Sequence, residues 1–85
     1  MNIKIFPSKR DMSVHLLEKV NGVEQYAEID NNLTRWDAGK IVNDIAVSLT
    51  NTKVNEAKDF IEVEGYTEGG AKTIIAAYKQ DEIDL

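Results

Sequence analysis

The chain has 85 residues, 42% of them hydrophobic, and no cysteine. This length suits one domain with a modest core, and the composition is typical of a folded protein rather than a disordered one. The lack of cysteine excludes disulfides and thiolate metal sites. Neither a signal peptide nor an apolar run long enough for a membrane helix is recognisable, so we expect a cytoplasmic protein.

Charge is distributed unevenly along the chain. The formal net charge is −5: residues 1–42 hold six Lys/Arg and six Asp/Glu, whereas residues 43–85 hold four Lys/Arg and nine Asp/Glu. The whole excess of negative charge therefore lies in the second half. That half should repel a phosphate backbone or an anionic membrane and attract a basic protein.

The first third of the chain is predicted to form β-structure. The alternation of residues 3–5 indicates a short N-terminal edge strand. Asn21 and Gly22 then stand between two alternating segments, a pattern typical of a type I′ turn. The sequence therefore predicts a β-hairpin with strands of about 13–20 and 23–30.

The two-residue turn also fixes which residues pair across the hairpin. One face is then largely apolar and the other largely polar. His15, the single histidine, falls on the polar face, where we expect a surface imidazole paired to the carboxylate of Glu28. The predicted pairs are Val20–Val23, Lys19–Glu24, Glu18–Gln25, Leu17–Tyr26, Leu16–Ala27, His15–Glu28 and Val14–Ile29.

A helix of about residues 35–49 is predicted after the hairpin. Thr34 is a suitable N-cap, and Asp37 lies in the first turn, where the helix dipole favours a carboxylate. Trp36 lies on the flank of the apolar stripe and is expected to close one end of the core. The stripe consists of Ala38, Ile41, Val42, Ile45 and Leu49.

Residues 53–80 fit two interpretations. The spacing of their apolar residues favours two further helices, of about 53–64 and 70–80. Residues 61–64 also alternate like a strand, and residues 73–75 also suit a strand. In that alternative the segment forms a second hairpin. Either way the fold class is α+β, in a single domain spanning residues 1–85 with an acidic, frayed tail at 81–85.

No combination of residues matches a catalytic, cofactor or metal-binding pattern. His15 has no second histidine and no cysteine to help it hold a metal. A calcium loop starting at Asp30 would need glycine where Arg35 stands and glutamate where Ile41 stands. We therefore expect no enzyme, no cofactor and no metal, and the acidic flanks argue against direct contact with nucleic acid.

The acidic half is the feature that bears on function. Its carboxylates can form an ordinary solubilising surface, or they can dock a basic protein by taking the places of phosphates. Aromatic residues, if exposed, would add apolar anchors. The candidate partner-binding residues are Glu56, Asp59, Glu62, Glu64 and Glu68, with Trp36 and Tyr66 as the aromatic anchors.

In length, lack of cysteine and acidic second half, the chain resembles the small early proteins with which bacteriophages disable host machinery. Some of these mimic DNA and block nucleoid proteins of the histone-like HU type. The resemblance implies a non-enzymatic, DNA-mimicking inhibitor that occupies the basic surface of a host DNA-binding protein. The alternative is a structural or assembly module that forms a homo-oligomer through a strand edge or a helix face.

Overall fold

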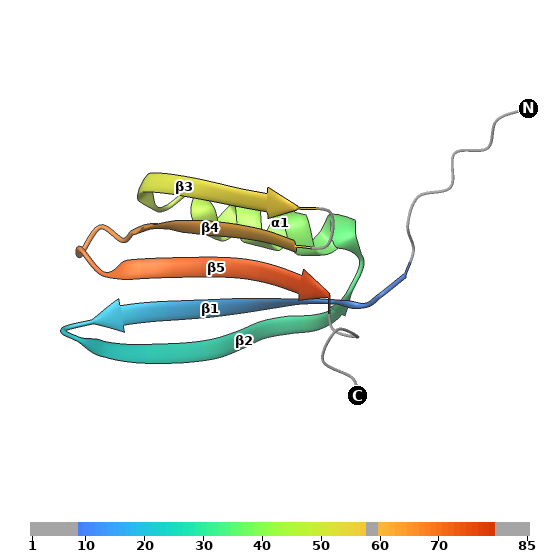
Figure 1. Ribbon diagram of the computed structural model, residues 1–85, viewed down its shortest axis with the longest axis horizontal. Coiled ribbons are helices and arrows are strands. Elements are labelled where there is room, and N and C mark those ends of the chain that lie inside the picture. Colours follow the sequence, from blue (N-terminus) through green and yellow to red (C-terminus); the bar gives the residue numbers. More distant parts are fainter. Residues whose placement is uncertain (1–8, 58–59, 80–85) are drawn as a thin grey trace, which may run out of the picture.

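The computed structural model describes residues 9–57 and 60–79, which form one antiparallel sheet and one helix (Figure 1). The strands lie in the order β2-β1-β5-β4-β3. The α+β class is confirmed, while the predicted strand at 3–5 and the acidic tail at 81–85 lie outside the described residues. The elements are β1 (Met12–Val20), β2 (Val23–Leu33), α1 (Arg35–Ala46), β3 (Thr50–Ala57), β4 (Phe60–Tyr66) and β5 (Lys72–Lys79).

The predicted hairpin is formed by β1 and β2. Its two turn residues have positive φ angles of 53° and 80°, as a type I′ turn requires. Every predicted pair from the turn to His15–Glu28 is present. The last pair is wrong, because a register shift places Val14 opposite Asp30 rather than Ile29. Such a shift marks an extra residue in one strand, which local sequence patterns do not reveal.

The helix begins where the sequence predicts. The Thr34 hydroxyl oxygen accepts a hydrogen bond of 3.0 Å from the backbone N–H of Asp37. The helix ends at Ala46 rather than at residue 49, because the N–H groups of Ser48 and Leu49 bond to carbonyls three residues back. Leu49 is nevertheless buried, so it joins the core from a turn rather than from the helix.

Residues 50–79 contain three strands, so the favoured prediction of helices over 53–64 and 70–80 is wrong. The alternative prediction, a second hairpin, is closer to the structure, because β4 and β5 do pair as a hairpin. It does not include the strand β3, which pairs with β4. The apolar run of β5 explains the error. This strand is central, and Thr73, Ile75, Ala76 and Ala77 are all buried. A short apolar run fits a buried strand and a buried helix equally well.

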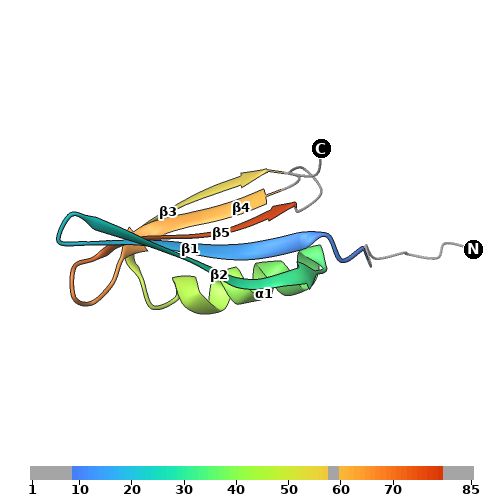
Figure 2. The ribbon, with the colours of Figure 1, turned by 90° about the horizontal axis from the view of Figure 1, so that it is seen from below.

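The core lies between the sheet and α1, which runs across one face of the sheet (Figure 2). The helix connects the two outer strands, β2 and β3, and so must cross the strands between them. Trp36 does not close the core as predicted, because it is 73% exposed. The buried cluster is Met12, Val14, Leu33, Ala38, Val42, Val63, Ile75 and Ala77.

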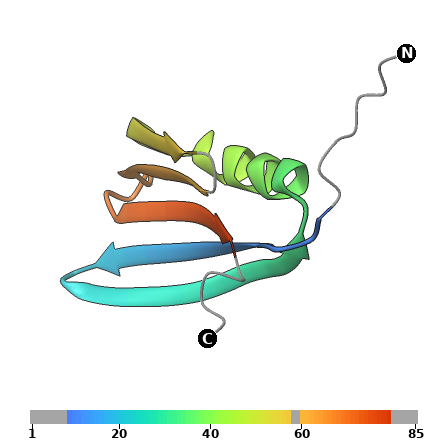
Figure 3. The same ribbon diagram turned by 45° about the vertical axis from the view of Figure 1, so that its right-hand side comes forward.

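The opposite face of the sheet is not covered by any element of the described chain (Figure 3). We call it the open face.

No helix in the described residues is both long enough and apolar enough to cross a membrane.

At Gly65, β4 approaches the end of the α1–β3 connection closely. A Cβ atom at this position would lie 2.9 Å from the Cβ of Leu49 and 3.0 Å from the carbonyl oxygen of Thr50. Real Cβ atoms do not approach this closely, so the glycine allows the start of β3 to lie beside the end of β4.

The turn of the first hairpin gives a test of its register. We expect Gly22→Val to reduce the free energy of unfolding by more than about 1 kcal/mol, because a β-branched residue resists positive φ. Gly69→Val is the control, because that glycine also lies in a turn but has no positive φ. Chemical denaturation measures both variants. Equal midpoints for Gly22→Val and the wild type would contradict the turn geometry.

Candidate functional site

The register of the strands determines which side chains project from the open face. Residues paired across neighbouring strands project to the same side, and successive residues project to opposite sides. His15 is paired with Glu28 of β2 and with Ala76 of β5, and Ala76 is paired with Glu62 of β4. Because Val14 and Ile75 face α1, this row faces away from the helix. Glu28 and Glu62, far apart in sequence, therefore flank the same open face.

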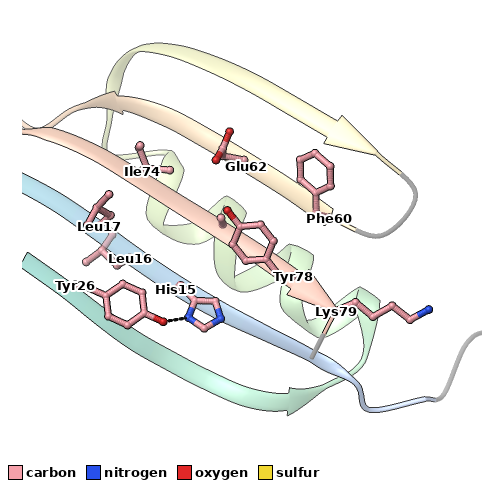
Figure 4. Close-up of a pocket in the computed structure, with 10 residues that line it drawn as sticks. His15, Leu16, Leu17, Tyr26, Phe60, Glu62, Ile74, Tyr78 and Lys79 are labelled. Carbon is pink, nitrogen blue, oxygen red and sulfur yellow. Dashed lines mark hydrogen bonds between the residues drawn. The ribbon is translucent and has the colours of Figure 1, made fainter. Parts of the chain in front are cut away.

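An aromatic row crosses this face over four strands. The ring of His15 lies 5.6 Å from that of Tyr26 and 5.8 Å from that of Tyr78, between centroids. The ring of Phe60 lies 6.2 Å from that of Tyr78. The planes of the two outer pairs are within 20° and 23° of parallel, so each of these pairs is stacked. Figure 4 shows the row running from β2 to β4.

A shallow hollow of about 700 Å³ lies along the aromatic row (Figure 4). Ala76 lies in its floor, with the larger side chains of its cross-strand neighbours His15 and Glu62 on either side. The small methyl group leaves room where a longer side chain would fill the face. The hollow is lined by His15, Leu16, Leu17, Tyr26, Phe60, Glu62, Ile74, Ala76, Tyr78 and Lys79.

His15 is held by two hydrogen bonds that the sequence did not indicate. Its Nε2 lies 2.7 Å from the hydroxyl oxygen of Ser13, and its Nδ1 is hydrogen-bonded to the hydroxyl of Tyr26. The expected pairing with Glu28 is therefore wrong, although the two residues are opposite each other in the register. Glu28 instead accepts a hydrogen bond of 3.0 Å from the side-chain amide of Asn31.

The contact between Ser13 and His15 has the form of a nucleophile beside a base. Ser13 is only 2% exposed, so a substrate cannot reach its hydroxyl in this conformation. The two hydrogen bonds instead fix the orientation of the imidazole ring within the aromatic row. We therefore infer that Ser13 and Tyr26 hold the imidazole ring of His15 in position.

The two glutamates that β4 places on the open face have different surroundings. Glu64 forms an ion pair of 3.0 Å with Lys72. The hydrogen bond between the two side chains and the negative charge of Glu64 raise the pKa of Lys72. Within residues 9–57 and 60–79, no lysine or arginine lies within ion-pair distance of Glu62. The negative charge of Glu62 beside the hollow is therefore not compensated by an ion pair with any described residue.

The predicted partner-binding residues are divided among several surfaces. Glu62, Glu64 and Tyr66 alternate along β4 and share the open face. Glu56 faces the other way, where it forms an ion pair of 3.2 Å with Arg35. The exposed Trp36 is on α1, Glu68 is in the turn between β4 and β5, and Asp59 lies outside the described residues.

Sequence reasoning missed the aromatic row and the hollow. Phe60 lies in the segment 53–64 and Ala76 and Tyr78 lie in 70–80, and the apolar spacing of both segments favours helices, in which these residues would not share a sheet face. The alternation of Ile74, Ala76 and Tyr78, matched by Phe60 and Glu62, was the available signal. It becomes informative only when both segments are taken as strands with a defined register.

No group of three or more histidine, aspartate or glutamate side chains in the described part of the chain is placed to hold a metal ion. Comparison of the chain with protein-family models, with curated proteins and with solved structures gives no match. The open face is therefore the feature of the molecule that bears on function.

Tyr78 gives a spectroscopic test of that geometry. Burial, followed by the charge of the nearby Glu62, raises the pKa of Tyr78 above the ordinary value of 10.0. Because the folded state holds this proton more tightly, the associated stability is present below pH 10 and is lost as the pH rises through the folded-state pKa. We expect Glu62→Gln to lower the pKa of Tyr78, with Tyr78→Phe identifying its step in a phenolate absorbance titration. Identical titrations of Glu62→Gln and the wild type would contradict the contact.

Proposed function

We propose that this protein is a non-enzymatic binding protein that docks on the basic surface of another protein through the open face of its sheet. One observation carries the proposal. The face that α1 leaves uncovered combines an aromatic row with carboxylates at both sides, and Glu62 among them has no ion-pair partner in the described chain.

This combination matches the composition of protein interfaces. Tyrosine is enriched among the residues that contribute most to binding, and such residues cluster in a centre surrounded by polar groups. Tyr26 and Tyr78 are 65% and 41% exposed, so a partner can reach both. The carboxylates of Glu28 and Glu62 would provide the complementary charge that guides a basic partner to this face.

The class of partner follows from the acidic character of the chain together with its resemblance to bacteriophage inhibitors. We propose a cytoplasmic target that normally binds DNA, such as a histone-like HU protein, with the carboxylates taking the places of phosphates. Glu62 and Glu64 on the open face support this role. Glu56 and Trp36 belong to the other side of the molecule, and Glu68 lies in the β4–β5 turn, so the proposed docking surface does not include these three residues.

Competition with DNA tests this function. We expect the protein to displace labelled duplex DNA from a purified histone-like HU protein. Displacement should weaken as salt rises from about 50 to 300 mM, because the Debye length falls from roughly 14 to 6 Å. Glu28→Lys combined with Glu62→Lys should abolish displacement, because both substitutions reverse charge on the open face.

The matched control is Asp44→Lys combined with Glu68→Lys. It changes the net charge equally, but Asp44 is an exposed residue of α1 and Glu68 lies in the β4–β5 turn. This variant should displace DNA nearly as well as the wild type. Equal losses in the two double variants would show that only total charge matters, and failure of the wild type to displace DNA would contradict DNA mimicry.

Assembly through a strand edge is a second candidate, and the exposure of β3 favours it. This outer strand is exposed along its whole length, and Val54 at its centre is 62% exposed. An unpaired strand edge is a template for pairing with another chain. If two copies pair through β3, sedimentation equilibrium should give a dimer that Val54→Lys dissociates. A monomer mass at all concentrations would exclude this candidate.

A further inference from the structure

The hollow beside Ala76 has the features of a site for one side chain of a partner. Aromatic rings border it, Ala76 forms part of its floor, and the Glu62 carboxylate stands beside it (Figure 4). Its volume of about 700 Å³ is within the range of pockets that hold small ligands. What could occupy it follows from its charge and from the arrangement of the rings.

The charge favours a cation. Glu62 has no ion-pair partner among residues 9–57 and 60–79, and Glu28 stands at the other end of the same cross-strand row. Lys79 reaches the rim of the hollow, but in Figure 4 its amine points away from Glu62. Aromatic platforms that stack nucleic acid bases combine rings with positive charge that holds the backbone. Carboxylates beside these rings would instead repel the phosphates.

The arrangement of the rings favours a planar cation over a compact one. The Phe60 and Tyr78 rings are stacked within 23° of parallel, and their centroids are 6.2 Å apart, so neither ring fully covers a face of the other. A guanidinium group can stack flat on an aromatic ring while its N–H groups bind a carboxylate in a bidentate manner. A lysine ammonium is more strongly hydrated and has no flat face to stack.

We propose that the hollow binds the guanidinium group of an arginine from the basic partner, stacked on Tyr78 and Phe60 and paired with the carboxylate of Glu62. The inference rests on the proposed function, because the arginine belongs to the protein that docks on the open face. The hydrogen bonds that His15 forms with Ser13 and Tyr26 keep its ring in place and so preserve the shape of the hollow.

The experiment uses three short peptides and needs no identified partner. Acetyl-Gly-Arg-Gly-amide is compared with its lysine counterpart and with its citrulline counterpart, which keeps the planar shape but lacks the charge. Amide shifts of the full chain are followed by NMR during each titration. The arginine peptide should shift residues of β1, β4 and β5 around the hollow, the lysine peptide should bind more weakly, and the citrulline peptide should produce no saturable change.

Three variants locate the site. Glu62→Gln should weaken binding of the arginine peptide roughly tenfold, the scale of losing a charge-assisted hydrogen bond. Glu64→Gln is the matched control, because it removes the same charge from the same strand and face but from a glutamate already paired with Lys72. It should change affinity less than twofold, within the scatter of an exposed ion pair. Ala76→Ile fills the hollow without changing charge and should abolish binding.

Equal binding of the citrulline and arginine peptides, or equal losses for Glu62→Gln and Glu64→Gln, would overturn the proposal. So would saturable binding of adenosine monophosphate at the same residues, because the hollow would then select bases. The test is separable from the competition with DNA. Loss of arginine binding with DNA displacement intact would remove only the arginine site, whereas arginine binding without displacement would remove only DNA mimicry.

Discussion

The position of β5 between β1 and β4 is the constraint on which the molecule depends. The two outer pairs, β1–β2 and β3–β4, are joined into one sheet only through this strand. Its alternation then determines the two faces. Ile75 and Ala77 point toward α1 and contribute to the core, while Ala76 and Tyr78 point the other way. The core and the open face are thus two sides of one strand. On the open face Ala76 is buried between the larger side chains of His15 and Glu62, although no helix covers it.

The alternation of side chains along the strands also divides the acidic residues between the two faces of the sheet. Along the sequence, the negative excess belongs to the second half of the chain. In space, strand periodicity sends Glu56 to one side of the sheet and Glu62 and Glu64 to the other. Glu28, from the neutral half, joins Glu62 on the open face through the register of β1 and β5. A continuous acidic segment therefore does not form one acidic surface, and the face that it contributes to also depends on the first hairpin.

The proposed binding surface on the open face has an apolar aromatic centre and acidic surroundings. In the centre, the side chains of Tyr26 and Tyr78 offer large contact areas with little conformational freedom to lose. In the surroundings, Glu64 is neutralised by Lys72, whereas Glu62 is not. Because of this difference, the negative charge on the open face is concentrated at Glu62 and not at Glu64, which the net charge of the chain does not reveal. The same difference also explains why the proposed arginine would pair with one carboxylate and not with the other.

Local chemistry determined the parts of this protein that the sequence predicts well. The positive φ angles at Asn21 and Gly22 set the hairpin and most of its register, and Thr34 set the start of the helix, because each effect acts within a few residues. The strands β4 and β5 form a second class, because their short apolar runs suit either period and because β5 also pairs with β1, which is far away in the chain. The candidate site belongs to this second class. Glu62, Glu64 and Tyr66 could be proposed from charge and residue type, but the hollow with His15, Phe60, Ala76 and Tyr78 exists only because pairing aligns four strands, which is a long-range property of the sheet.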